Sequence, residues 1–129
     1  MKRLTYITPI LIVLLLSLAI AQSRPYAKYN GDGETIGLFN LGRNGIDCRD
    51  RQAMSGTASG SRYRAIDTEV EYNFTLDMGR RRRFIGFRLD RDAIPQKDVE
   101  NLLINNRRFR ITVAGCLNGG VWNAEKITR

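Results

Sequence analysis

The stretch Arg107–Thr128, RRFRITVAGCLNGGVWNAEKIT, largely decides how this chain folds. In its first half Phe109, Ile111 and Val113 alternate with polar residues, and a period of two is typical of a β-strand with one buried face. The residues Asn118-Gly119-Gly120 then tolerate positive φ, which a tight hairpin turn requires. The stretch therefore predicts two antiparallel strands joined by a glycine-rich turn.

Three more strands are predicted upstream of this hairpin. Ser55–Arg64 is the first, and its glycines Gly56 and Gly60 mark a bend or bulge. Glu69–Met78 alternates apolar and polar residues along its whole length, which indicates one buried face and one exposed face. Phe84–Leu89 returns as its partner and places Phe84 on the face opposite its apolar residues.

A short helix is predicted between these strands and the hairpin, over Pro95–Asn106. Pro95 suits the first helical position, because its missing N–H would have no intrahelical partner there. Val99, Leu102 and Leu103 follow at the spacing of one helical face. The order of elements is thus three strands, one helix and two strands.

The N-terminal residues 1–21 have the features of a cleaved signal peptide. Lys2 and Arg3 precede the apolar run Ile10–Ile20, and Ala19-Ile20-Ala21 offers small residues at a cleavage site. The run is short for a membrane span, which needs about 20 residues. We therefore expect a secreted or periplasmic protein without a membrane span; the alternative is an uncleaved anchor.

The next segment, residues 22–54, is rich in glycine and has little periodicity. We expect it to be irregular and flexible up to about Glu34, and Ile36–Leu41 either to form one short strand or to pack over the end of a barrel. The division of the chain is then a signal peptide, this glycine-rich segment, and a folded domain over residues 55–129.

The chain has two cysteines and no histidine. In an exported protein Cys48 and Cys116 are expected to form one disulfide, with two free thiols as the alternative. The lack of histidine excludes Ser-His-Asp catalysis and histidine metal sites. Glu69 and Glu71 share one strand face and suit a divalent cation, or else pair with nearby arginines. We predict no cofactor and no catalytic residues.

Arginine dominates the charge of the chain. Lys and Arg number 21 against 13 Asp and Glu, for a net charge of +8. The planar guanidinium suits phosphate, sulfate and carboxylate, so the arginines indicate either an anionic partner or only a soluble basic surface. The run Arg80–Arg83 is either a ligand contact or a solvated turn. The predicted ligand-binding residues are Arg62, Tyr63, Arg64, Arg80, Arg81, Arg82, Arg83, Phe84, Arg88, Arg108, Arg110 and Trp122.

Tyr63, Phe84 and Trp122 are included in this prediction because bases stack on aromatic rings in proteins that bind single-stranded nucleic acids. For Phe84 and Trp122 the alternative is packing in the core.

The order of elements resembles the OB-fold, a five-stranded Greek-key barrel with a helix between its third and fourth strands. The resemblance rests on Gly56 and Gly60, the Pro95–Asn106 helix, and the pattern Val113-x-Gly115 followed by Gly120-x-Trp122-x-Ala124-x-x-Ile127. The closing pattern is similar to the end of small exported bacterial OB-fold proteins. The resemblance as a whole covers about Ser55 to Thr128. It implies a mainly β barrel plus the irregular N-terminal segment.

Three functions remain open from the sequence. The first is an exported, non-catalytic module that binds an anionic ligand, such as nucleic acid, an acidic glycan or an envelope component. The second is a structural or oligomeric subunit that binds a protein or a host glycan, as pentameric toxin B subunits with OB-folds do. The third is a divalent-cation-dependent hydrolase, because exported nucleases of the staphylococcal type are also OB-folds that use carboxylates, Ca²⁺ and Arg, although this chain does not match their motif.

Overall fold

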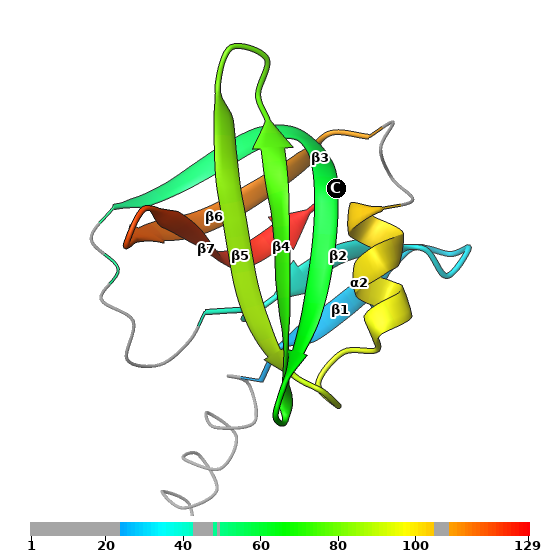
Figure 1. Cartoon of the computed structure of the whole chain (residues 1–129). Helices are drawn as coiled ribbons and strands as arrows, with labels where there is room; N and C mark the ends of the chain where they lie inside the picture. The colour runs from blue at the N-terminus through cyan, green and yellow to red at the C-terminus, as the bar shows by residue number, and fades with distance from the viewer. Residues whose placement is uncertain (1–23, 43–47, 49, 105–108) are drawn as a thin grey trace, which may run out of the picture.

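The structure, a computed structural model, describes residues 24–42, 48, 50–104 and 109–129. The fold is mainly β, with 61% strand and one short helix (Figure 1). The elements in chain order are β1 (Tyr26–Tyr29), β2 (Thr35–Phe39), β3 (Arg51–Ile66), β4 (Glu69–Asp77), β5 (Arg82–Asp90), α2 (Gln96–Leu103), β6 (Ile111–Asn118) and β7 (Val121–Thr128).

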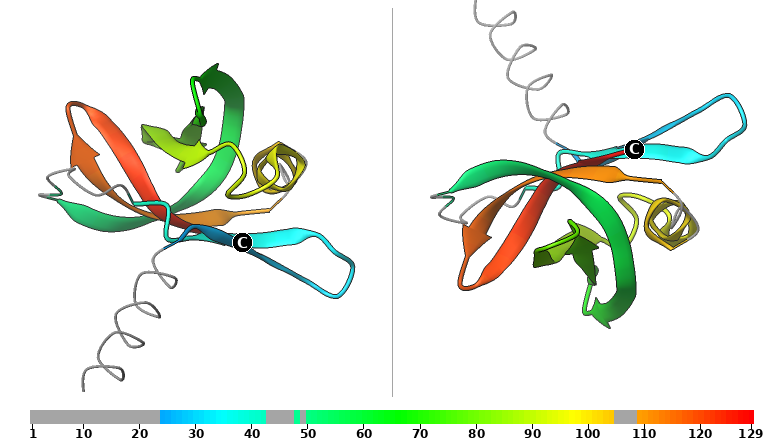
Figure 2. Two further views of the ribbon diagram at one scale, coloured as in Figure 1. Left: turned by 90° about the horizontal axis from the view of Figure 1, so that it is seen from below. Right: turned by 90° about the horizontal axis from the view of Figure 1, so that it is seen from above.

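The seven strands form one sheet in which five strands close into a partial ring. The strand order is β1-β2-β7-β5-β4-β3-β6, and β6 also pairs with β7. The ring therefore runs β3, β4, β5, β7, β6 and back to β3. All its pairings are antiparallel except β5 with β7. Figure 2 shows this ring from its two ends.

The long strand β3 bends, so that it pairs with β6 along its first part and with β4 along the rest. Its residues from Arg51 to Gly56 pair with β6, and those from Thr57 onward pair with β4. The register shifts between Ser59 and Arg62, where Gly60 has a φ of +61°. A residue with a Cβ is strained in that conformation. The predicted bulge in this strand is therefore confirmed, although the strand is longer than Ser55–Arg64.

The core fills the inside of the ring, with the alternation that the sequence predicted. The completely buried side chains include Phe74 and Leu76 of β4, Ile85 of β5, and Val113 of β6. Helix α2 lies beside β2 and β3 and buries its apolar face, Val99, Leu102 and Leu103. It begins after Pro95 and ends at Leu103, so it is shorter than predicted. Among the described residues, no helix has the length and apolarity to cross a membrane.

The prediction that the N-terminal segment is irregular before Glu34 is wrong for the residues that form β1. Residues before Glu34 were expected to be flexible, but β1 and β2 form a hairpin with Tyr26 stacked on Phe39 at 5.1 Å. The predicted short strand near Ile36 is confirmed as β2, which joins the sheet by pairing Leu38 with Ile127. In Figure 2 this hairpin extends away from the ring. The sheet thus has two strands besides the five of the predicted barrel, and of these only β1 was not expected.

The turn and the disulfide match their predictions. Gly119 and Gly120 have φ values of +62° and +82° and join β6 to β7. Cys48 and Cys116 are bonded to each other, with their Cα atoms 5.2 Å apart. The bond fastens the segment before β3 to β6.

Candidate functional site

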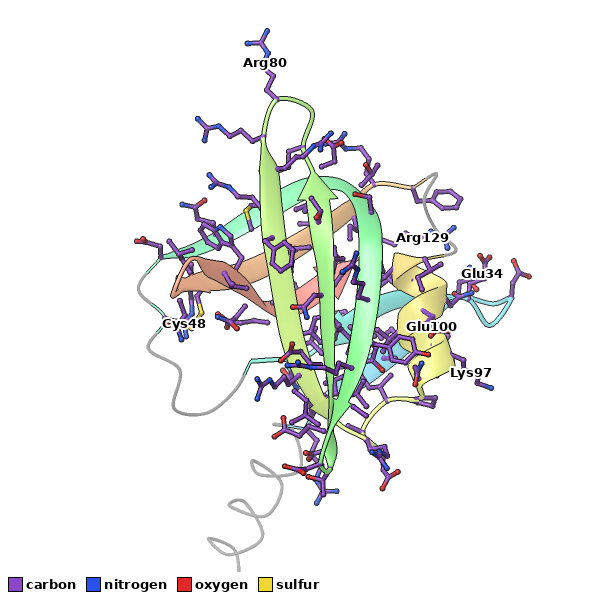
Figure 3. All side chains as sticks on the ribbon, viewed as in Figure 1. Glu34, Cys48, Arg80, Lys97, Glu100 and Arg129 are labelled. Carbon is purple, nitrogen blue, oxygen red and sulfur yellow. A yellow bond between two sulfur atoms is a disulfide. The ribbon has the colours of Figure 1, made fainter. Side chains whose placement is uncertain are left out.

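The turn between β4 and β5 exposes the first two residues of the arginine run, Arg80 and Arg81, to solvent. The Met78 N–H donates to the Arg81 carbonyl at 2.9 Å, and Gly79, at a φ of +93°, donates its N–H to the Asp77 carboxylate at 3.0 Å. These bonds satisfy the turn locally and leave the Arg80 and Arg81 side chains exposed. Figure 3 shows Arg80 at the far end of this turn.

Strand alternation sends the next two arginines to opposite faces of β5. Arg82 lies opposite Asp77, with its Nε 4.0 Å from the carboxylate, and its side chain is 78% exposed. Arg83 lies opposite Leu76, which is completely buried, so it points to the inner side of the ring. The Arg83 guanidinium carbon is 5.7 Å from the centre of the Trp122 ring. Its Nε is buried and has no acceptor among the described residues.

A groove of about 460 Å³ opens beside this turn, and we call it the turn groove. Its lining combines three arginines with small, apolar and uncharged polar residues, and no acidic residue among the described ones lines it. The lining residues are Gln52, Ala53, Met54, Ser55, Met78, Arg80, Arg81 and Arg83. The first four come from β3, so the groove lies between the start of that strand and the β4–β5 turn.

A second set of arginines lies on what we call the outer face, the side of β3, β4 and β5 that points away from the core. Glu71 is at its centre, because its pairing register places Arg64 on one side and Arg88 on the other. The Arg88 guanidinium donates to the Glu71 carboxylate at 2.9 Å, and an Arg64 nitrogen is 3.7 Å away. Asn73 donates to the same carboxylate at 3.1 Å.

These contacts change the acidity of Glu71. The hydrogen bond from Asn73, followed by those from Arg88 and the charges of both arginines, lowers the pKa of its carboxyl below the ordinary value. Partial burial opposes this effect but does not reverse it. The carboxylate is already neutralised by arginine, which favours ion pairing over cation binding for Glu71. Within the described part of the chain, the one cluster with metal-ligand spacing is Cys48, Cys116 and Glu125, whose thiols are consumed by the disulfide.

A second groove, of about 400 Å³, lies over the outer face and the start of β7. Its polar lining includes Glu71, Asn73 and Arg88 together with Asn118 and Asn123. Gly86 lies at its base, and a Cβ there would approach the Asn73 amide oxygen to 2.8 Å. The two grooves are therefore on opposite faces of β5 and differ in charge balance, because only this one contains an acid.

The three aromatic residues proposed for stacking are in three different places. Phe84 is 54% exposed on the outer face, as its alternation predicted. Tyr63 is also 54% exposed, but it lies opposite Tyr72 on the side of β3 that faces α2. Trp122 is only 5% exposed and lies under Arg83. Only Phe84 is placed beside arginines with its ring open to a ligand.

The remaining predicted arginines are dispersed. Arg62 is exposed on the outer face opposite Asn73. Arg110 donates to the Ser55 carbonyl at 3.3 Å near the start of β6. Arg108 lies outside the described residues. Sequence reasoning found the arginines but missed Met54, Met78 and Gln52 as their neighbours, because these contacts depend on how β3 curves past the β4–β5 turn.

Comparison of the chain with known protein families, curated proteins and solved structures finds no match. Its function is therefore argued from the arrangement of its own residues.

Proposed function

We propose that this protein is an exported, non-catalytic binding module whose arginine-rich surface contacts an anionic ligand, such as nucleic acid, an acidic glycan or an envelope component. The observation that carries the proposal is the turn groove. Arg80, Arg81 and Arg83 line it, no acid does, and none of the three has an acidic partner within the described residues. A concentration of uncompensated cations attracts anions and repels other cations.

We further propose that the ring is an OB-type barrel. Its strand order β3-β4-β5-β7-β6, with α2 between the third and fourth strands, has the order of that fold. OB-folds bind their ligands on the face of the second and third strands and on adjacent loops. Here those strands are β4 and β5, which carry the arginine run and Phe84. This correspondence favours the outer face of β4 and β5, where Phe84 lies, whereas the charge distribution favours the neighbouring turn groove on the other face of β5.

Export is part of the proposal and rests on two independent features. The charged and apolar pattern of residues 1–21 is that of a signal peptide. The Cys48–Cys116 bond fits an oxidising compartment, because disulfides persist there and are rare in the cytosol of most organisms.

The test is a titration of the purified protein with single-stranded oligonucleotide and with a sulfated polysaccharide, at low and high salt. Binding is followed by the fluorescence of Trp122, which lies directly under Arg83. We expect saturable binding to at least one polyanion, with an affinity that falls as salt rises because counterions are released. Binding of both with equal salt dependence would indicate a general polyanion module, and binding of one would identify its class.

Two variants of equal charge make the test specific. Arg80→Gln with Arg81→Gln removes two cations from the turn groove. Arg91→Gln with Lys97→Gln removes two cations elsewhere: the Arg91 N–H donates to Thr68, at the opposite end of β4, and Lys97 lies on α2 (Figure 3). The proposal requires the first pair to weaken binding more than the second. If neither polyanion binds at low salt, the proposal fails and a protein or neutral glycan becomes the better candidate partner.

A further inference from the structure

Arg83 differs in its surroundings from the other arginines of the predicted binding set that the structure describes. Its Nε is buried without an acceptor in the described structure, while the side chain as a whole lines the turn groove. A guanidinium that has lost water on one side and has gained no protein acceptor there is incompletely compensated. An anion that reaches its remaining N–H groups replaces more lost hydration than it would at an exposed arginine.

The position of this guanidinium is also fixed by its neighbours. It lies over the ring of Trp122 at 5.7 Å, and a cation is attracted to the face of an aromatic ring. Trp122 itself is buried, and β5 holds Arg83 opposite the completely buried Leu76. A fixed guanidinium loses less side-chain entropy when it binds than an arginine that is free in solvent. The site therefore has one ordered cation at its base.

The rest of the turn groove suits a compact anion attached to an organic group. Arg80 and Arg81 line the same groove from the turn, and their exposed side chains add positive charge near an anion held by the Arg83 fork. Met54, Met78 and Ala53 give the groove an apolar side, and Gln52 offers an amide. With a volume of about 460 Å³, the groove has room for more than an isolated ion.

We infer that the turn groove is a discrete site for one phosphate or sulfate ester group, which binds to the Arg83 guanidinium above Trp122 with Arg80 and Arg81 around it. This inference rests on the proposed function and deepens it, because it specifies a single anionic group where that proposal requires only a polyanion. The ester belongs either to a phosphorylated or to a sulfated ligand, and the geometry of the two groups is the same.

The experiment is a titration by two-dimensional NMR of the 15N-labelled protein at constant ionic strength. The probes are inorganic phosphate, inorganic sulfate, glucose 6-phosphate and glucose 6-sulfate. The signals followed are the Trp122 indole N–H and the Arg83 Nε–H. We expect saturable shifts of both signals, and the stronger ester identifies the source of the ligand. Arg83→Gln should weaken binding by about tenfold or more, since it removes a charge-assisted hydrogen bond.

Two control variants distinguish binding at this site from binding that depends only on the overall positive charge. Arg82→Gln makes the same change at the adjacent residue on the outer face, and we expect it to alter the affinity by less than about twofold, as a loosely paired exposed charge would. Arg83→Lys keeps the charge and the packing volume but loses the fork, so it should bind more weakly than the wild type while remaining folded by circular dichroism.

Two results would overturn the inference. In the first, the Arg82 and Arg83 variants lose affinity equally, which means that charge alone matters. In the second, none of the four small anions gives saturable shifts although a long sulfated polysaccharide binds the same sample. The second result rejects the discrete site and leaves the proposed polyanion module standing, whereas failure of the polysaccharide itself rejects both.

Discussion

Arg83 of the turn groove and Arg88 of the outer face come from the same strand, β5, yet the arginines of these two regions have opposite surroundings. On the outer face Arg64 and Arg88 contact one carboxylate, that of Glu71. In the turn groove Arg80, Arg81 and Arg83 have no acidic partner in the described part of the chain. One set is compensated by the protein and the other is left for water or a ligand.

The difference teaches that the number of arginines on a surface does not locate a binding site. A paired arginine must lose its intramolecular partner, or share it, before it gains an external anion. Exposed ion pairs contribute only about 0–1 kcal/mol, so the pairing around Glu71 weakens the attraction for a ligand more than it stabilises the fold. Uncompensated charge, together with a concave surface, is the better indicator of a site.

The largest expected effect is on the turn groove. Replacement of Arg80, Arg81 and Arg83 together by Gln should lower the affinity for a single-stranded polyanion by about tenfold or more. If all three contact phosphates, the slope of log affinity against log salt should fall by about 2, since each contact contributes roughly 0.7 on a single strand. The measurement is the fluorescence titration repeated at four salt concentrations. An unchanged slope would mean that the ligand contacts other residues.

A smaller effect, of opposite sign, is expected on the outer face. Glu71→Gln releases Arg64 and Arg88 from their shared carboxylate, so the affinity for the same polyanion should rise by about threefold, within the range of an exposed ion pair. Glu34→Gln is the matched control, because Glu34 pairs with Arg129 at 3.4 Å on the far side of α2 from the turn (Figure 3). An equal rise in both variants would show only the change in net charge.

Much of the fold was predictable because its signals are local. The alternation in β4 and β5, the glycines of the β6–β7 turn and the apolar face of α2 each lie within a few residues, and all were confirmed. The strand β1 was missed, and with it the hairpin that it forms with the expected strand β2. Its strands have only four and five residues, which is too short to show a period, and its stability comes from pairing with β7 and stacking of Tyr26 on Phe39.

The candidate site was less predictable, for a physical reason that Arg83 illustrates. The alternation of Leu89, Phe87 and Ile85 continues to Arg83 and assigns it to the inner face, but the run Arg80–Arg83 reads as one uniform turn. The partners of Glu71 depend on the register of three strands, and the lining from β3 depends on the change of its pairing from β6 to β4 after Gly56. Such contacts join residues distant in the chain, so no local pattern contains them.

The smallest expected effect is on the pH dependence of folding stability, which tests whether Glu71 is held ionised by the arginines of the outer face. Because its pKa is lowered in the folded protein, Glu71 contributes stability that is present above its unfolded pKa and is lost as pH falls through the folded pKa. Wild type should therefore exceed Glu71→Gln in stability at neutral pH by roughly 0.5 kcal/mol or less, as exposed pairs do. That difference should disappear below the folded pKa.

The measurement is urea denaturation of both proteins from pH 7 down to pH 2.5. Glu34→Gln again serves as the control, because it removes a carboxylate that pairs with Arg129 and contacts neither Arg64 nor Arg88. If the difference between wild type and Glu71→Gln is constant with pH, the carboxylate is not held ionised by its neighbours. Arg64 and Arg88 would then be as available to a ligand as the arginines of the turn groove, and the distinction between the two regions would be lost.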